Sequence, residues 1–280
     1  MNLTSPSHVK AWCLAHDFHP NKTLGQNFLI DKNALDAILD AADLPPPDPV
    51  SPARVLEVGP GLGVLTEGLL QRGCAVTAIE KDPVLAARLA EALGTPAHLD
   101  VIAGDALDLA KAGRLAGFPV MVSNLPYQAG TRILLELLRR IDDAPAGTPC
   151  AAPETIVVLV QTEVAERLAA GPGSKTRGLA GVWAQLDYDV APVRTVKATC
   201  FWPRPDVGST VVKLVRHHRN DALAPEARAL FRQLTKQAFE HRRKQLGAIF
   251  KGRIESTARA EELANEDWLT LTKALTRENS

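Results

Sequence analysis

The chain has 280 residues, and its 32 basic and 32 acidic side chains leave no formal net charge. Apolar residues make up 46% of it and charged residues 23%, which is typical of a soluble globular protein and excludes disordered and fibrous classes. No apolar run approaches the roughly 20 residues needed to cross a bilayer, and the first residues lack the pattern of a signal peptide. We therefore expect a cytoplasmic protein with no membrane partner.

Residues 53–161 alternate short β-branched runs with stretches of helical periodicity. This alternation is typical of βαβ units and predicts a doubly wound, Rossmann-like α/β fold. The expected strands are Arg54–Val58, Ala75–Glu80, Ala97–Ala103, Val120–Ser123 and Thr155–Gln161. The expected helices between them are Val64–Gln71, Pro83–Leu93 and Thr131–Ile141.

After these units the pattern changes. The proline-rich stretch Pro145–Pro153 predicts a surface connection. Two further strands are expected at Val190–Lys197 and Ser209–Arg216, joined by the proline-rich segment Phe201–Val207. Together they predict a hairpin that closes the sheet.

From Pro225 onward the periodicity is helical. We expect two domains: residues 1–216 form the α/β domain, and residues 217–280 form a small C-terminal helical domain. Four scattered cysteines, Cys13, Cys74, Cys150 and Cys200, fit neither a disulfide framework nor metal-ligand spacing, so we expect isolated thiols and no metal site.

The helical domain carries a cluster of basic residues. Between Pro225 and Arg253 only Glu226 and Glu240 are acidic, whereas the basic residues are Arg228, Arg232, Lys236, Arg242, Arg243, Lys244, Lys251 and Arg253. A local basic surface can bind phosphate even on a neutral molecule, because screening limits each contact to about 8–10 Å. The alternative, a solvated helix face, is the commoner role of such clusters.

A glycine-rich turn, Glu57–Gly63, follows the first expected strand and opens a helix. Its pattern places the third glycine one position earlier than the dinucleotide fingerprint does. Glu80 ends the second strand, where a carboxylate can accept both ribose hydroxyls, and Asp105 follows the third strand, where it can accept from an adenine amine. The order predicts a nucleoside pocket at the carboxyl edge of the sheet. Alternatively, the glycines only make a turn and both acids cap helices.

Asn124–Tyr127, with the sequence Asn-Leu-Pro-Tyr, ends the fourth expected strand and points into the same crevice. An adenine amine is a poor nucleophile because its lone pair is delocalised. The Asn124 side-chain oxygen and the Leu125 carbonyl, held by the rigid Pro126, can accept its two hydrogens and direct the lone pair at a methyl sulfonium. Tyr127 offers a ring face for the base. The bland alternative is an Asn-x-Pro turn at a strand end.

Taken together, these motifs resemble the KsgA/RsmA family of small-subunit ribosomal RNA adenine dimethyltransferases, from about Lys22 to Phe250. Besides the glycine turn and Asn124–Tyr127, the resemblance rests on Leu24–Leu29, Ile79–Glu80, Gly104–Ala106, Gln161–Leu168, Pro172–Lys175 and Phe201–Ser209.

The resemblance implies a class I methyltransferase sheet that binds S-adenosylmethionine. It implies a lid segment, 22–31, over the cofactor. The implied cofactor contacts are Asn27, Leu29, Gly59, Glu80, Asp105 and Asn124, to which the glycine turn adds Gly61.

The resemblance also implies the substrate side. Phe201 would face Tyr127 across a flipped target base; its alternative is a plain core residue at a strand end. The expected reaction is N6-dimethylation of two adjacent adenines near the 3′ end of 16S rRNA in immature small subunits. The run Arg242, Arg243 and Lys244 would dock this RNA, and nothing demands more than a monomer.

The chain departs from the usual family sequence on the substrate side. Arg177–Ala180 replaces a usual Tyr-Gly-Arg-Leu, Asp206–Thr210 replaces Lys-Val-Asp-Ser-Ala, and Arg132 stands where proline is common. These departures leave the number of methyl groups and the choice of RNA open.

Two alternatives of function therefore remain, a 23S rRNA adenine methyltransferase and a non-catalytic RNA-binding assembly or transcription factor on the same fold. An NAD-dependent oxidoreductase is disfavoured because no residue has an evident role in hydride transfer.

Overall fold

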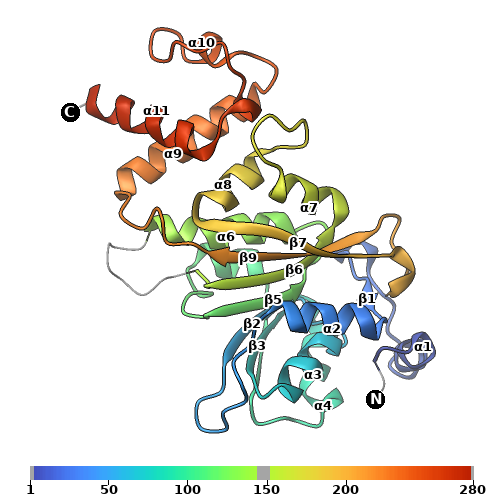
Figure 1. Cartoon of the computed structure of the whole chain (residues 1–280). Helices are drawn as coiled ribbons and strands as arrows, with labels where there is room; N and C mark the ends of the chain where they lie inside the picture. The colour runs from blue at the N-terminus through green and yellow to red at the C-terminus, as the bar shows by residue number, and fades with distance from the viewer. Residues whose placement is uncertain (1–2, 144–151, 279–280) are drawn as a thin grey trace.

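The computed structural model describes residues 3–143 and 152–278 and centres on a seven-stranded sheet (Figure 1). The strand order is β4-β3-β2-β5-β6-β9-β7. The strands are β2 (Arg54–Val58), β3 (Ala75–Glu80), β4 (Leu99–Ala103), β5 (Val120–Asn124), β6 (Thr155–Gln161), β7 (Tyr188–Val196) and β9 (Ser209–Arg216). The first five run parallel, whereas β9 is antiparallel to both β6 and β7.

The expected α/β fold and closing hairpin are thus confirmed. Two strand starts differ from expectation: β4 begins at Leu99 and β7 at Tyr188. Cys150 and most of the expected connection Pro145–Pro153 lie outside the described residues.

Helices cover both faces of the sheet. Along β6, Ile156 and Val158 pack in one apolar cluster while Val157 and Leu159 pack in the other, as the two-residue period of a strand requires. The helices on the first face are α5 (Ala106–Lys111), α6 (Gly130–Asp143), α7 (Thr162–Ala169) and α8 (Leu179–Asp187). On the second face are α2 (Lys32–Ala41), α3 (Val64–Gln71) and α4 (Pro83–Ala92).

The N-terminal segment, for which no secondary structure was expected, forms helix α1 (Pro6–Ala15). Its Val9, Trp12 and Cys13 are buried in a cluster that also holds Phe28. Residues 28 and 29 form the short strand β1 (Phe28–Leu29), which pairs antiparallel with β8 (Phe201–Trp202). The amino-terminal part of the chain is thereby held against the segment that precedes β9.

The C-terminal helices lie at the end of the molecule opposite α1 (Figure 1). They are α9 (Pro225–Glu240), α10 (Leu246–Ile249) and α11 (Asn265–Glu278). Their apolar cluster also includes Val182 and Leu186 of α8, so the helical unit shares its core with the sheet domain. The domain division at residue 216 stays a proposal.

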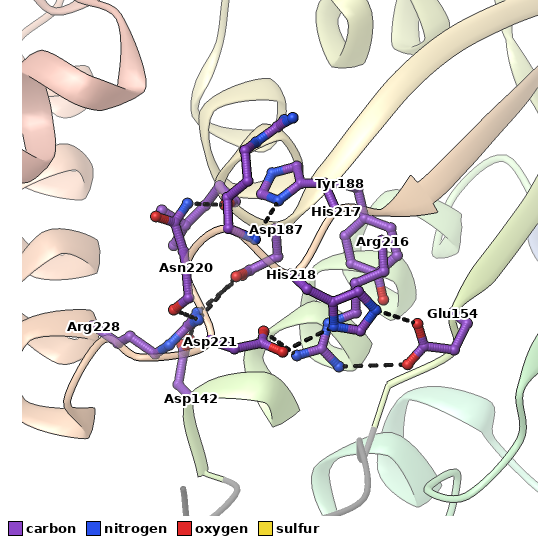
Figure 2. A network of polar contacts seen from close by, with 12 residues as sticks. Asp142, Glu154, Asp187, Tyr188, Arg216, His217, His218, Asn220, Asp221 and Arg228 are labelled. Carbon is purple, nitrogen blue, oxygen red and sulfur yellow. Dashed lines mark hydrogen bonds and ion pairs between the residues drawn. The ribbon is translucent and has the colours of Figure 1, made fainter. Parts of the chain in front are cut away.

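A buried ionic network joins this unit to the sheet domain (Figure 2). Arg228 of α9 donates to the two carboxylate oxygens of Asp187 at 2.9 and 3.0 Å and lies 3.3 Å from Asp142. Arg232 also binds Asp142. Both arginines are buried, at 2% and 7% exposure, so the expected basic surface loses two of its members to internal ion pairs. Burial without pairing would be too costly for either charge.

None of the helices in the described parts of the chain is long and apolar enough to span a bilayer. Cys13, Cys74 and Cys200 are free thiols. Within residues 3–143 and 152–278, no cluster of three His, Cys, Asp or Glu side chains could hold a metal ion.

Candidate active site

A cavity of about 310 Å³ opens at the carboxyl edge of the parallel strands. Its walls come from four segments that the sequence singled out, together with Leu3 and Val9 near the N-terminus. The segments are Thr23–Leu29, Glu57–Leu62, Gly104–Leu107 and Asn124–Ala129. Glu80 also lines it. The candidate cofactor residues and the Asn-Leu-Pro-Tyr segment therefore share one crevice.

The glycine turn between β2 and α3 forms the floor of this crevice. Gly59 and Gly61 have φ angles of +70° and +58°, which side chains rarely adopt. A side chain at Gly61 would place its first carbon 3.0 Å from the ring of Phe28. The turn is anchored because the Gly59 amide donates to the Ile79 carbonyl at 2.9 Å.

Glu80 is buried at the end of β3, with both carboxylate oxygens against backbone amides. One accepts from Gly61 N at 3.0 Å and the other from Asp82 N at 2.8 Å. Burial raises the pKa of Glu80, although these hydrogen bonds oppose the rise. Asp82 caps helix α4, so the capping alternative for Glu80 is not realised.

Asp105 does act as a helix cap. One of its oxygens accepts from Leu107 N at 2.8 Å at the start of α5, and the other lies 2.8 Å from the Lys81 ammonium. The hydrogen bond from Lys81 lowers the pKa of Asp105 and keeps it an acceptor. Its expected contact with an adenine amine stays a prediction, because capping and ligand binding can use different lone pairs.

Glu57, named only as part of the glycine motif, is a buried carboxyl next to the turn. Its Oε2 accepts from the Thr66 hydroxyl at 2.7 Å. Burial raises its pKa from 4.5 to about 8, so the group is protonated at neutral pH. The sequence signal was available, since Glu57 lies between the apolar residues Leu56 and Val58 of a strand expected to be buried.

Asn124 is oriented by the lid. Its Nδ2 donates to the main-chain carbonyl of Asn27 at 3.2 Å. Because a carbonyl only accepts, this bond fixes which end of the amide is which and leaves Oδ1 as an acceptor. The adjoining Leu125 is buried, and its amide donates to the Leu159 carbonyl at 3.1 Å.

Tyr127 is half-buried, and its hydroxyl lies 2.6 Å from the hydroxyl of Ser209, the first residue of β9. Burial raises the pKa of Tyr127. Ser209 had no assigned role in the sequence, and no local signal links positions 82 residues apart.

Phe201 is only 2% exposed and packs in the apolar cluster with Leu29 and Val196. It lies outside the residues that line the cavity, whereas Tyr127 is among them. The structure therefore does not bring the two rings together around an open base site. The stacking role of Phe201 stays a prediction, and it requires its buried ring to become accessible to a base.

The lid segment is hydrogen-bonded to the cofactor side of the crevice. Gln26 Nε2 donates to Asp82 Oδ2 at 2.9 Å, while the opposite oxygen of Asp82 caps α4. Leu29 is 1% exposed and pairs with Phe201 through β1 and β8. Asn27 presents its carbonyl to Asn124.

The basic run lies beyond α9, outside the cavity lining. Arg243 and Lys244 are exposed. Arg242 is partly engaged within the protein: its guanidinium donates to the Lys175 carbonyl, and its Nε lies 3.6 Å from Glu261. RNA binding by this run stays a prediction.

Residues 17–276 match the family model described as ribosomal RNA adenine dimethylase. Relatives named "Ribosomal RNA small subunit methyltransferase A" are similar over most of the chain. The relative from Corynebacterium efficiens is 38% identical, covering 93% of this chain and 87% of the relative. The relative from Deinococcus radiodurans is 43% identical, covering 87% of this chain and 76% of the relative.

Two solved structures share the fold. A dimethyladenosine transferase from Plasmodium falciparum is 23% identical, with a TM-score of 0.73 and coverage of 90% of this chain and 98% of that one. The 23S rRNA methyltransferase ErmE is 24% identical, with a TM-score of 0.65 and coverage of 89% and 100%.

Proposed function

Because the chain belongs to the ribosomal RNA adenine dimethylase family, we propose that it transfers methyl groups from S-adenosylmethionine to the N6 amines of two adjacent adenines near the 3′ end of 16S rRNA. It does so on immature small subunits, in the cytoplasm and as a monomer. The observation that carries the proposal is the Asn124 amide, whose nitrogen is held by the Asn27 carbonyl so that its oxygen can accept from the target amine.

The residues of the crevice fit the cofactor. A nucleoside requires a close approach to backbone, and the positive φ angles of Gly59 and Gly61 allow it. Glu80 retains lone pairs beside its two backbone bonds and is placed to accept ribose hydroxyls. When bound, S-adenosylmethionine supplies an activated methyl group on a sulfonium, so the protein needs no strong general base.

The protein's own contribution to the reaction is positioning. Asn124 Oδ1 and the Leu125 carbonyl accept the two hydrogens of the amine, which directs its lone pair toward the donor. The Tyr127 ring, fixed through Ser209, gives the base one stacking face worth about 1–3 kcal/mol. Phe201 supplies the second face, for which its buried ring has to become accessible.

The test is incubation of unmethylated small subunits with labelled S-adenosylmethionine, followed by mapping of the methylated nucleosides. We expect N6,N6-dimethyladenosine at two adjacent positions near the 3′ end of 16S rRNA. Large subunits are incubated under the same conditions. Methylation of their 23S rRNA instead would identify the large subunit as the substrate, and no methylation of either RNA would favour a non-catalytic assembly factor.

The variant Asn124→Ala tests the role of Asn124 in methyl transfer. We expect it to lower the methyl-transfer rate about 100- to 1,000-fold, because one of two acceptors in the transition state is lost. The dissociation constant for S-adenosylmethionine, measured by calorimetry, should change much less. Retained turnover in this variant would remove Asn124 from the chemistry.

A further inference from the structure

The loop between α7 and α8 lies where the chain departs from the usual family sequence, and it touches the helical unit. The Gly173 amide donates to the Glu261 carbonyl at 2.8 Å, and Arg242 donates to the Lys175 carbonyl. In Figure 1 this yellow loop reaches toward the orange and red C-terminal helices. A segment of the sheet domain is therefore placed beside the start of the basic run.

A buried arginine anchors this loop from below. Arg177, which stands where the family usually has tyrosine, is 1% exposed. It donates to the Ala170 carbonyl at 2.9 Å, to Gln185 Oε1 at 3.2 Å and to Asn265 Oδ1, at the start of α11, at 3.2 Å. Its guanidinium therefore forms hydrogen bonds inside the protein and connects both ends of the loop to α8 and α11.

Three basic side chains are exposed in the segments next to this anchor. Lys175, Arg243 and Lys244 are exposed, and none of the three forms an ion pair with an acid in the described part of the chain. Glu261, the acid next to them, is already approached by Arg242. Because Arg242 bonds to the main chain of Lys175, the lysine side chain starts beside the basic run.

We propose that Lys175 joins Arg243 and Lys244 in one phosphate-binding surface that crosses from the sheet domain to the helical unit and receives the RNA backbone. Arg177 is its positioning residue. The inference rests on the proposed RNA substrate. It explains what the departure at residue 177 does: an internal cation holds the loop in a position where its exposed lysine continues the surface.

The test is the salt dependence of binding to unmethylated small subunits, measured for Lys175→Ala. Loss of one phosphate contact should lower the slope of log affinity against log salt by about 0.7–0.9 and weaken binding about three- to tenfold at low salt. Lys175→Arg should keep the slope of the wild type. Lys111→Ala removes an exposed lysine on α5 and is the matched control, for which we expect no change.

A slope for Lys175→Ala equal to that of the wild type, while Arg243→Ala lowers it, would overturn the proposal. Failure of the inference is distinguishable from failure of the proposed function, because methyl transfer by the wild type to the mapped adenines tests the function without any change at Lys175. Absence of methyl transfer by the wild type would instead refute the function itself.

Arg177→Met tests the anchor. The variant removes no exposed charge, so a lower salt slope with unchanged affinity for S-adenosylmethionine would show that loop position matters. An unchanged slope in the folded variant would remove Arg177 from the proposal. If thermal unfolding shows that this variant does not fold, the comparison of Lys175→Ala with Lys111→Ala alone tests whether Lys175 belongs to the phosphate-binding surface.

Discussion

Two regions of the molecule, the crevice and the junction with the helical unit, bury carboxyl groups that have different kinds of partner. In the crevice, Glu57 accepts from the Thr66 hydroxyl and Glu80 from backbone amides, and burial raises the pKa of both. At the junction with the helical unit, Asp187 faces the guanidinium of Arg228. The crevice carboxyls thus have neutral donors only, whereas the junction carboxylate has a countercharge.

This difference separates two uses of burial. A buried ion pair fixes two elements in register and costs much to break, because removal of one partner leaves an unpaired charge. A buried carboxyl without a countercharge lowers stability when ionised, but keeps acceptor capacity for a ligand. The ion pairs of the junction therefore hold the two units in a fixed position, whereas the carboxyls of the crevice keep the capacity to bind a ligand.

The largest expected effect is at the junction. Asp187→Ala should lower the free energy of unfolding by up to about 3–5 kcal/mol, because the buried Arg228 loses its two-bond partner and keeps only Asp142, which Arg232 also binds, as a countercharge. Chemical denaturation measures the change. The double variant Asp187→Leu, Arg228→Met should lose clearly less than the single one; equal losses would mean that the charge pair is not what holds the junction.

In the crevice, Glu57→Gln should reveal the opposite behaviour. The pKa of Glu57 is near 4.5 when unfolded and about 8 when folded, so between these values the folded state holds one proton more. The wild type should therefore lose stability, by a few kcal/mol in all, as pH rises from about 4.5 to about 8. Glu57→Gln should lack this loss.

The measurement is the free energy of unfolding of both proteins across this pH range. Their difference should be small below pH 4.5 and level off above about 8, with the variant the more stable. A difference independent of pH would show that Glu57 does not change protonation on folding.

A smaller effect concerns the substrate wall of the crevice. Ser209→Ala should lower the methyl-transfer rate a few-fold, because the Tyr127 ring loses its hydrogen bond at 2.6 Å. Affinity for S-adenosylmethionine should not change. In a double-mutant cycle with Tyr127→Phe, the two effects on rate should be strongly non-additive. Simple additivity would show that the two hydroxyls act separately.

The smallest effect is expected at the exposed rim of the junction. His218 bridges Asp221 at 2.9 Å and Glu154 at 2.8 Å, and the hydrogen bond to Asp221 raises its pKa above 6.5 (Figure 2). Its contribution to stability is present below pH 6.5 and is lost as pH rises through the raised pKa. His218→Gln should lower the melting temperature slightly at pH 6 and not at pH 9. An equal shift in melting temperature at pH 6 and pH 9 would show that protonation of His218 does not contribute to stability.

The sheet and its crevice could be predicted because their signals are local. The glycine turn, Glu80 and Asp105 each lie at or next to the end of an apolar strand, and the parallel order brings these strand ends together. The segment Asn124–Tyr127 was placed at the crevice for the same reason.

The junction could not be predicted in this way. Arg228 and Asp187 are 41 residues apart, and Arg232 and Asp142 are 90 apart, so neither pair has a local signal. A partial signal did exist: Arg228 and Arg232 share the helix face of Phe231 and Thr235, which is buried. Helix α1 was likewise missed, although Val9, Trp12 and Cys13 have helical spacing after Pro6.

Helix α6 has a consequence for the choice of RNA. It begins three residues after Tyr127, and near its other end Asp142 binds Arg228 and Arg232 of α9. Its 14 residues correspond to about 20 Å. The distance between Tyr127 in the crevice and α9, after which the basic run follows, is therefore set by one continuous helix. Under the proposed docking, an RNA would be selected by the distance between its target adenines and its docked backbone, and this selection needs no hydrogen bonds to base edges.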